Sequence, residues 1–251
     1  MRSIYYLLFA LLFFISCASK NVSSEKKIKI ATATQHLGEE YYNSGQYTAA
    51  LKKLLEAYET LPDDPYLHNS LGLVYLAKKR ESLAEEHFKT ALKLKPDYIH
   101  AKNNLGVTYL KQKKWDLAIE YFEKVADNLL YATPEIPLSN LGWAYFNQKM
   151  YKKARFYFEK ALDIQPDFLF AIHGLSSIYI KTEYYAKAID YLHYKLKNNP
   201  EAAILHSDLA KVYEALKDYS QARKSWNLVL QLEPSTSPLA REAQERLIQL
   251  D

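Results

Sequence analysis

The chain has 251 residues, including 33 Lys or Arg and 29 Asp or Glu, and its formal net charge is +4. Five of the basic residues and one acidic residue lie within residues 1–30, so residues 31–251 are electrically neutral. Because nucleic-acid binding needs clustered Lys and Arg, this balance argues against a nucleic-acid partner. The six glycines argue against a loop-rich β fold, and the single cysteine excludes an internal disulfide or a Cys-based zinc site.

The N-terminal residues have the composition of a secretory signal. A positive start, Met1-Arg2-Ser3, precedes an apolar and aromatic run from Ile4 to Ile15. This run is too short to cross a bilayer, which takes about 20 residues, but it fits the apolar region of a signal peptide, about 7–15 residues long. We therefore expect residues 1–16 to be a signal peptide.

The only cysteine follows this run. The sequence Phe14-Ile15-Ser16-Cys17 resembles the lipobox of bacterial lipoproteins, although Phe14 stands where Leu is usual. The resemblance implies that Cys17 becomes the lipidated (palmitate-bearing) mature N-terminus, and the following Ala18 and Ser19 imply transfer to the outer membrane. Two alternatives remain: an ordinary signal in which Cys17 is incidental, and a short uncleaved anchor.

Residues 18–30 are rich in Ser and Lys and carry no apolar period. We therefore expect residues 17–30 to be the lipidated cysteine and a flexible tether, with the lipid as the membrane contact. The net positive charge of the tether would add a weak attraction to anionic headgroups.

A repeat of 34 residues follows, from residue 31 to residue 236. A small residue, always preceded by Leu, recurs at Gly38, Gly72, Gly106, Gly142, Ser176 and Ala210. Tyr stands three positions after it, at Tyr41, Tyr75, Tyr109, Tyr145, Tyr179 and Tyr213. Ala stands twelve positions after it, at Ala50, Ala84, Ala118, Ala154, Ala188 and Ala222. A large apolar residue stands sixteen positions after it, at Leu54, Phe88, Phe122, Phe158, Leu192 and Trp226. Pro closes five units, at Pro62, Pro96, Pro166, Pro200 and Pro234.

This pattern resembles the tetratricopeptide repeat family. The resemblance implies an all-α, right-handed α-solenoid of six helix-turn-helix repeats, at residues 31–64, 65–98, 99–132, 135–168, 169–202 and 203–236. Small residues let the two helices of a hairpin approach, and Pro turns the chain toward the next hairpin. Residues 237–251 are expected to be a capping helix with Leu239, Ala243, Leu247 and Leu250 along one face.

The junction between the third and fourth repeats is irregular. Two residues are inserted, Leu130 occupies the Pro position, and Pro134 and Pro137 follow. A tolerated loop insertion is one interpretation. Together with the end at Cys17 and the segments Asn103-Asn104-Leu105-Gly106 and Asn140-Leu141-Gly142, the junction resembles the type IV pilus biogenesis lipoproteins, most strongly over residues 99–168.

That resemblance implies a pilotin: a lipid-anchored protein on the periplasmic face of the bacterial outer membrane, which binds the pilus secretin and promotes its localisation and oligomerisation. The alternative is a periplasmic adaptor for a peptidoglycan hydrolase or a protease, or a part of an outer-membrane assembly machine. We expect no enzyme, cofactor, metal or small-molecule substrate. The sequence has no Gly-rich phosphate loop, no His-Glu-x-x-His pair and no Gly-x-Ser-x-Gly elbow.

In this family the first helix of each hairpin lines the concave surface. The partner-binding groove is therefore predicted at Tyr42, Asn69, Leu73, Leu76, Asn103, Val107, Leu110, Trp143, Phe146, His173 and Ile180. An apolar strip flanked by amides suits an amphipathic or extended segment, with Trp143 as its anchor. Lys111, Lys181 and Lys211 are too dispersed to favour an acidic peptide tail. Alternatively, some of these residues pack only between neighbouring repeats.

Overall fold

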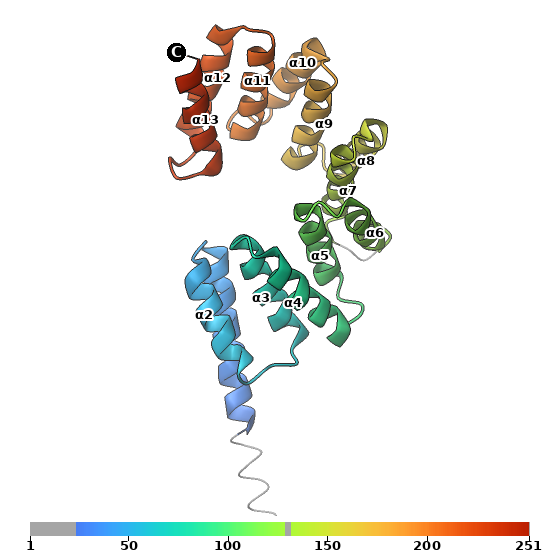
Figure 1. Ribbon diagram of the computed structural model, residues 1–251, viewed down its shortest axis with the longest axis vertical. Helices are drawn as coiled ribbons and strands as arrows, with labels where there is room; N and C mark the ends of the chain where they lie inside the picture. Colours follow the sequence, from blue (N-terminus) through green and yellow to red (C-terminus); the bar gives the residue numbers. More distant parts are fainter. Residues whose placement is uncertain (1–23, 129–131, 251) are drawn as a thin grey trace, which may run out of the picture. The chain divides into compact units, whose positions relative to one another are not determined.

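The computed structural model describes residues 24–128 and 132–250, which form helices joined by short turns and no strand (Figure 1). The first helix comprises residues 24–43. The helices that follow are α2 (Tyr47–Tyr58), α3 (Pro65–Ala77), α4 (Glu81–Leu94), α5 (Ile99–Lys111), α6 (Trp115–Ala126), α7 (Glu135–Asn147), α8 (Tyr151–Ile164), α9 (Leu169–Lys181), α10 (Tyr185–Leu196), α11 (Ala203–Ala215), α12 (Tyr219–Leu232) and α13 (Pro238–Gln249). The all-α fold predicted from the sequence is thus confirmed.

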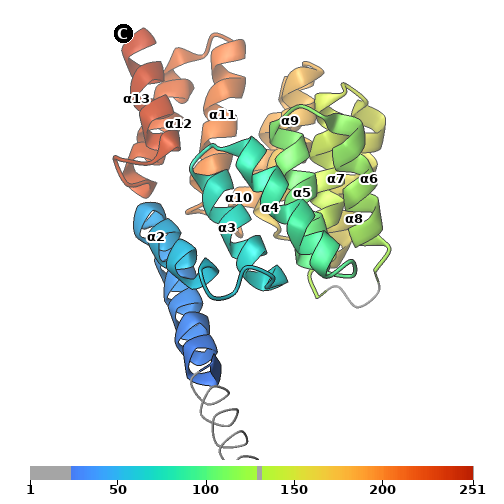
Figure 2. The ribbon, with the colours of Figure 1, turned by 60° about the horizontal axis from the view of Figure 1, so that its bottom comes forward.

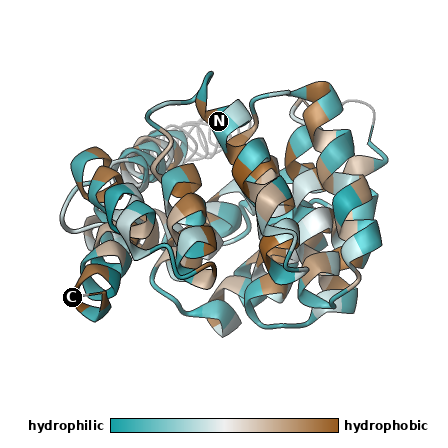
Figure 3. Cartoon of the chain, turned by 90° about the horizontal axis from the view of Figure 1, so that it is seen from above, coloured by the Kyte–Doolittle hydropathy of each residue, from teal (hydrophilic) through white to brown (hydrophobic). Residues whose placement is uncertain are grey.

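The chain divides into two compact units, Met1–Lys113 and Lys114–Asp251. In the N-terminal unit, α3 packs against α4, and α4 packs in turn against α5. In the C-terminal unit α7 packs most extensively against α8, and α11 against α12. The two helices of each pair lie side by side in Figure 2. Figure 3 shows that the helices carry both hydrophobic and hydrophilic residues, as expected for hairpins that bury one face against a neighbour.

The small and large columns of the repeat form the core of each hairpin. All six alanines of the Ala column and all six large residues of the apolar column are fully buried. Gly72 shows why the small column is needed, because a Cβ built there would lie 2.6 Å from the ring of Phe88 on α4. Gly142 meets Phe158 on α8 in the same way, at 2.5 Å. The small residues therefore set how closely the two helices of a hairpin approach.

Each hairpin turn contains one residue in the left-handed region. In the first turn it is Gly45, with φ of 76°. In the later turns a residue with a side chain takes the same place, at Lys79, Lys113, Lys149, Glu183 and Lys217, with φ between 57° and 62°. In five of these turns the next backbone N–H donates to the carbonyl of the Tyr column; Arg80, for example, donates to Tyr75 at 2.9 Å. This is the Schellman arrangement that ends a helix.

The N-terminal helix differs from the flexible tether predicted at residues 17–30. Residues 24–30 are helical and exposed, so this part of the prediction is wrong, while Cys17 lies outside the described residues. The segment holds no Gly or Pro, and Lys29 Nζ pairs with Glu25 one turn earlier at 2.7 Å. Local propensity therefore continues the helix beyond the part that the repeats bury.

Prolines and a Ser cap define two later helix starts. At the irregular junction, Pro134 is the N-cap of α7, and Pro137 is buried in its first turn, where a missing N–H costs no helical hydrogen bond. At the C-terminus, the Ser237 side chain accepts a hydrogen bond from the Ala240 N–H, with Pro238 in the first turn. Helix α13 then packs against α12 through Ala243 and the half-buried Leu239, Leu247 and Leu250.

Candidate partner-binding surfaces

The N-terminal unit contains a cavity of about 520 Å³ between the first helix and α3, with Tyr98 just before α5. The sequence-predicted residues Tyr42, Asn69 and Leu73 all line it. Asn69 and Leu73 come together because they lie four positions apart on α3, on one face of that helix. The structure thus brings these three predicted residues to one surface.

The other predicted residues of this unit lie outside the cavity. Leu76, Asn103, Val107 and Leu110 are each half-buried on α3 or α5, and none lines the cavity. Their role as partner contacts stays a prediction.

Two carboxylates that were not predicted from the sequence also line the cavity. Glu39 Oε1 accepts hydrogen bonds from Ser70 Oγ at 2.7 Å and Gln35 Nε2 at 3.1 Å, and its other oxygen lies 3.1 Å from His36 Nδ1. Asp64 caps α3 by accepting from the Leu67 N–H at 2.8 Å. Both acids lie at positions that vary between the repeats, so the sequence pattern does not mark them. Their shared position at the cavity becomes visible only in the folded structure.

Two tyrosines complete the cavity wall. The Tyr66 and Tyr98 rings meet edge to face with centroids 5.1 Å apart. Burial raises the pKa of Tyr98 to about 12, and the nearby Tyr66, Glu39 and Asp64 contribute in the same direction. The phenol therefore stays neutral at physiological pH in a locally negative environment.

Asn69 supplies a buried amide to the same cavity. Its side chain is 7% exposed, and its Oδ1 accepts a hydrogen bond from Asn104 Nδ2 at 2.9 Å. Within residues 24–128 and 132–250, the Asn69 amide nitrogen has no hydrogen-bond partner. This N–H group is therefore available to an acceptor that enters the cavity.

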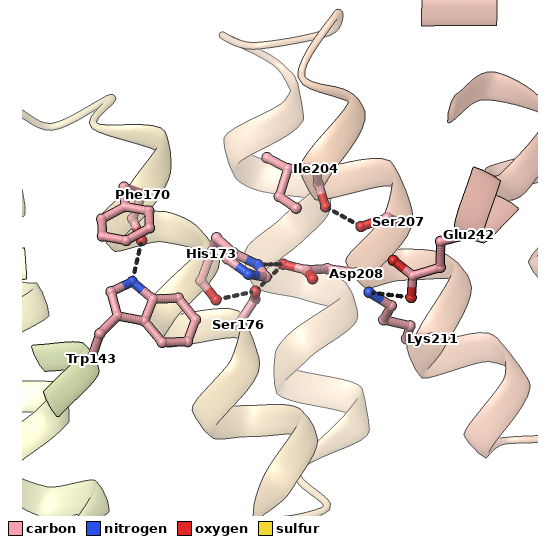
Figure 4. Close-up of polar contacts among 9 residues, drawn as sticks. All are labelled: Trp143, Phe170, His173, Ser176, Ile204, Ser207, Asp208, Lys211 and Glu242. Carbon is pink, nitrogen blue, oxygen red and sulfur yellow. Dashed lines mark hydrogen bonds and ion pairs between the residues drawn. The ribbon is translucent and has the colours of Figure 1, made fainter. Parts of the chain in front are cut away.

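The C-terminal unit gathers aromatic rings around Trp143. The Trp143 ring lies 5.1 Å from His173, 5.3 Å from Phe146 and 5.5 Å from Phe170. Figure 4 shows Trp143 Nε1 directed at the Phe170 carbonyl, to which it donates at 3.4 Å. The structure therefore brings the predicted Trp143, Phe146 and His173 together and adds Phe170, which is 44% exposed.

A buried carboxylate holds this cluster to the first helix of the next repeat. His173 Nδ1 donates to Asp208 Oδ2 at 2.8 Å, and Ser176 Oγ donates to the same oxygen (Figure 4). In a catalytic triad the histidine would instead be the base bound to the serine hydroxyl. This arrangement ties α9 to α11, and it explains why the small column carries Ser at position 176.

The other residues that the sequence analysis considered for the groove of this unit lie apart from the rings around Trp143. Ile180 is half-buried on α9 against the Leu192 core cluster of this unit. Lys211 Nζ pairs with Glu242 Oε1 at 3.0 Å (Figure 4), so its charge is already matched within the chain. Lys111 and Lys181 are exposed.

Four sequence profiles of the tetratricopeptide repeat match residues 38–79, 65–98, 97–167 and 175–238. The chain is a tetratricopeptide repeat protein. The family predicted from the six-column pattern is therefore confirmed. Tetratricopeptide repeats generally act as protein-interaction scaffolds without catalysis, so the surfaces above are candidate protein-binding sites.

Solved structures of this fold include two pilus proteins. The crystal structure of PilW, described as a widely conserved type IV pilus biogenesis factor, has a TM-score of 0.71 and 23% identity, covering 86% of this chain and 98% of PilW. PilF of Pseudomonas aeruginosa has a TM-score of 0.65 and 22% identity, covering 88% of this chain and 99% of PilF. The Cut9–Hcn1 structure of the APC/C has a TM-score of 0.67 and 20% identity, but this tetratricopeptide protein covers only 42% of that chain. At these identities the likeness shows the shared fold.

No curated protein sequence matches this tetratricopeptide protein significantly. In the part of the chain that the structure describes, no group of three or more His, Cys, Asp and Glu side chains is placed to hold a metal ion. No helix within the described ranges is long and apolar enough to cross a membrane.

Proposed function

We propose that the protein is an outer-membrane lipoprotein that binds the secretin of a type IV pilus and promotes its localisation and oligomerisation. The extent of the likeness to PilW carries this proposal. It covers 98% of a pilus biogenesis factor, whereas the likeness to the Cut9–Hcn1 structure covers 42% of that chain. A match over most of both chains supports a shared role better than a match that covers less than half of a longer chain.

The N-terminal sequence supports a lipid anchor. The sole cysteine, Cys17, follows an apolar run in a lipobox-like segment. A lipid at this position would keep the repeats at the inner surface of the outer membrane, where a secretin ring assembles.

The repeats offer binding surfaces suited to such a role. The N-terminal unit presents a cavity lined by Tyr42, Asn69 and Leu73, and the C-terminal unit presents the rings around Trp143. Aromatic anchors of this kind dominate the energetics of protein interfaces. Promotion of assembly would then follow from binding alone.

The experiment compares chromosomal deletion with complementation by three forms of the chain: unaltered, Cys17→Ser and Ala18→Ser. We expect Cys17→Ser to lose palmitate labelling, to leave the outer-membrane fraction and to reduce multimeric secretin there. Ala18→Ser retains the cysteine and a small neighbouring residue, so it should behave as the unaltered chain.

Persistence of multimeric secretin at the outer membrane after deletion would overturn the pilotin role. Co-purification of a peptidoglycan hydrolase, a protease or an outer-membrane assembly protein in place of secretin would select the adaptor function. Retained palmitate labelling in Cys17→Ser would overturn the anchor.

A further inference from the structure

The cavity of the N-terminal unit has the size of a side-chain pocket. Its volume of about 520 Å³ lies in the range of small-ligand sites, about 300–1,000 Å³, and it is open to solvent. Its wall combines the aliphatic Leu73 with aromatic and acidic groups. A long side chain of a partner fits within it.

The charge of the wall selects for a cation. Glu39 and Asp64 both line the cavity, and His36, which pairs with Glu39, carries a positive charge only when it is protonated. Each carboxylate oxygen offers about two acceptor positions, and the hydrogen bonds described for Glu39 leave one of the four open. An incoming ammonium or guanidinium group would find an acceptor there, whereas a carboxylate would meet like charges.

The two tyrosines of the wall already hold a cation from the chain itself. Lys95 Nζ lies 4.8 Å from the Tyr66 ring centroid and 5.6 Å from that of Tyr98, and it donates to Tyr66 Oη at 2.7 Å. Cations are attracted to aromatic faces at such distances. Lys95 shows that this ring pair can contact an ammonium group, although Lys95 itself reaches the rings from outside the cavity lining and is held mainly through the Tyr66 hydroxyl.

The Asn69 side chain favours a ligand that has a backbone carbonyl. The residue is more than nine-tenths buried, it lines the cavity, and among the described residues its amide nitrogen has no partner. A free amine or an amine headgroup carries no carbonyl in a position to accept from it. The carbonyl of an extended segment does, in the manner of side-chain amides that bind peptide backbones.

From these observations we propose that this cavity binds a Lys or Arg side chain of an extended partner segment. Glu39 and the faces of Tyr66 and Tyr98 hold the cation, and Asn69 Nδ2 donates to a backbone carbonyl of the segment. The inference goes beyond the proposed function, because it names the side-chain chemistry that the N-terminal unit recognises and holds for any protein partner.

The test uses the full chain purified in detergent and four fluorescent seven-residue peptides that differ only at the central position. The peptides carry Lys, Arg, norleucine or Glu between identical Ala and Leu flanks, and binding is measured by fluorescence anisotropy. We expect Lys and Arg peptides to bind about tenfold more tightly than the norleucine peptide, and the Glu peptide to bind weakest. Added salt should reduce the preference.

Matched variants show which residues cause the preference for the Lys and Arg peptides. Glu39→Gln should remove the advantage of the Lys peptide, while Glu40→Gln, an exposed neighbour outside the cavity, should retain it. Lys95→Met should strengthen Lys-peptide binding, because it removes a like charge from the ring pair. Asn69→Leu should weaken all four peptides by a similar factor, since the backbone is common to them.

Three results would overturn the proposal: equal binding of the Glu and Lys peptides, equal effects of Glu39→Gln and Glu40→Gln, and displacement of the Lys peptide by putrescine at the affinity of the peptide itself. The last result would assign the cavity to a free amine. Circular dichroism of each variant separates a lost site from a lost fold. None of these readouts involves secretin or membranes, so failure here leaves the proposed function standing, and the reverse also holds.

Discussion

Asp208 on α11 and His173 on α9 are joined by a hydrogen bond of 2.8 Å between Oδ2 and Nδ1, with the Asp208 side chain 1% exposed. The two residues occupy corresponding helices of consecutive repeats. A buried carboxylate is stable only when donors satisfy it, and here a His and a Ser from the preceding repeat do so.

Replacing Asp208 should therefore destabilise the C-terminal unit. Asp208→Ala leaves His173 Nδ1 and Ser176 Oγ without their acceptor, and we expect a loss of about 2–4 kcal/mol in the free energy of unfolding. Urea denaturation followed by circular dichroism measures it. The exposed Asp190→Ala serves as the control and should change stability by less than about 0.5 kcal/mol; equal losses in the two variants would contradict the structural role.

The His pair of the N-terminal unit should make stability depend on pH. His87 Nδ1 lies 2.9 Å from His68 Nδ1, and burial, followed by the charge of His68, lowers the pKa of His87 from 6.5 to about 4. Between these values the unfolded chain binds a proton that the folded chain does not, so stability falls as pH drops from 6.5 to 4.

The variant His87→Phe keeps an aromatic ring to stack on Tyr75 but has no titrating group. Urea midpoints between pH 7 and pH 4 should fall less steeply for this variant than for the unaltered chain. The difference between the two curves isolates His87 from the carboxylates that titrate in both proteins. Parallel curves would refute the assignment.

The left-handed turn residues predict opposite effects of glycine at two equivalent positions. Lys149 has φ of 61°, which is unfavourable for a residue with a Cβ, so Lys149→Gly should raise stability by about 0.5–1 kcal/mol. Gly45 has φ of 76° with nothing near its missing Cβ, so Gly45→Ala should lower stability by about 1 kcal/mol through backbone strain alone. Thermal unfolding measures both changes, and equal signs would exclude backbone strain as their cause.

Trp143 should anchor the protein partner of the C-terminal unit. Trp143→Ala removes a ring that contacts Phe146, Phe170 and His173, and we expect about tenfold or greater loss of secretin binding in a pull-down titration. Trp143→Phe should lose less. Tyr184→Ala, which removes a ring that is 62% exposed outside this cluster, is the control; unchanged binding by a folded Trp143→Ala chain would argue that the ring only packs between repeats.

The packing of the hairpins was predictable because it recurs. Ala84 and Phe88 stand at fixed distances from Gly72, and five other units carry Ala and a large apolar residue at the same two positions, so one physical constraint is visible six times. Their complete burial confirms the interpretation of these columns. Recurrence also identified Trp143 and His173 as residues of a first helix, but not their mutual contact.

Features that occur once were not predictable in the same way. Asp208 resembles any polar residue until Ser176 and His173 are seen to converge on it. Glu39 and Asp64 are separated in sequence and meet around one cavity only after folding. The left-handed turn residues were also missed, because four of them are Lys, and a residue with a Cβ gives no signal for positive φ.

The helical residues 24–30 limit how far the repeats can stand from a membrane. If Cys17 carries the lipid, seven residue-to-residue steps of the chain separate it from the first described residue, and seven such steps span at most about 25 Å. The exposed helical part adds about 10 Å at 1.5 Å per residue. An anchored molecule of this design would search for its partner within a layer a few nanometres deep beside the bilayer, so that encounter would occur largely in two dimensions.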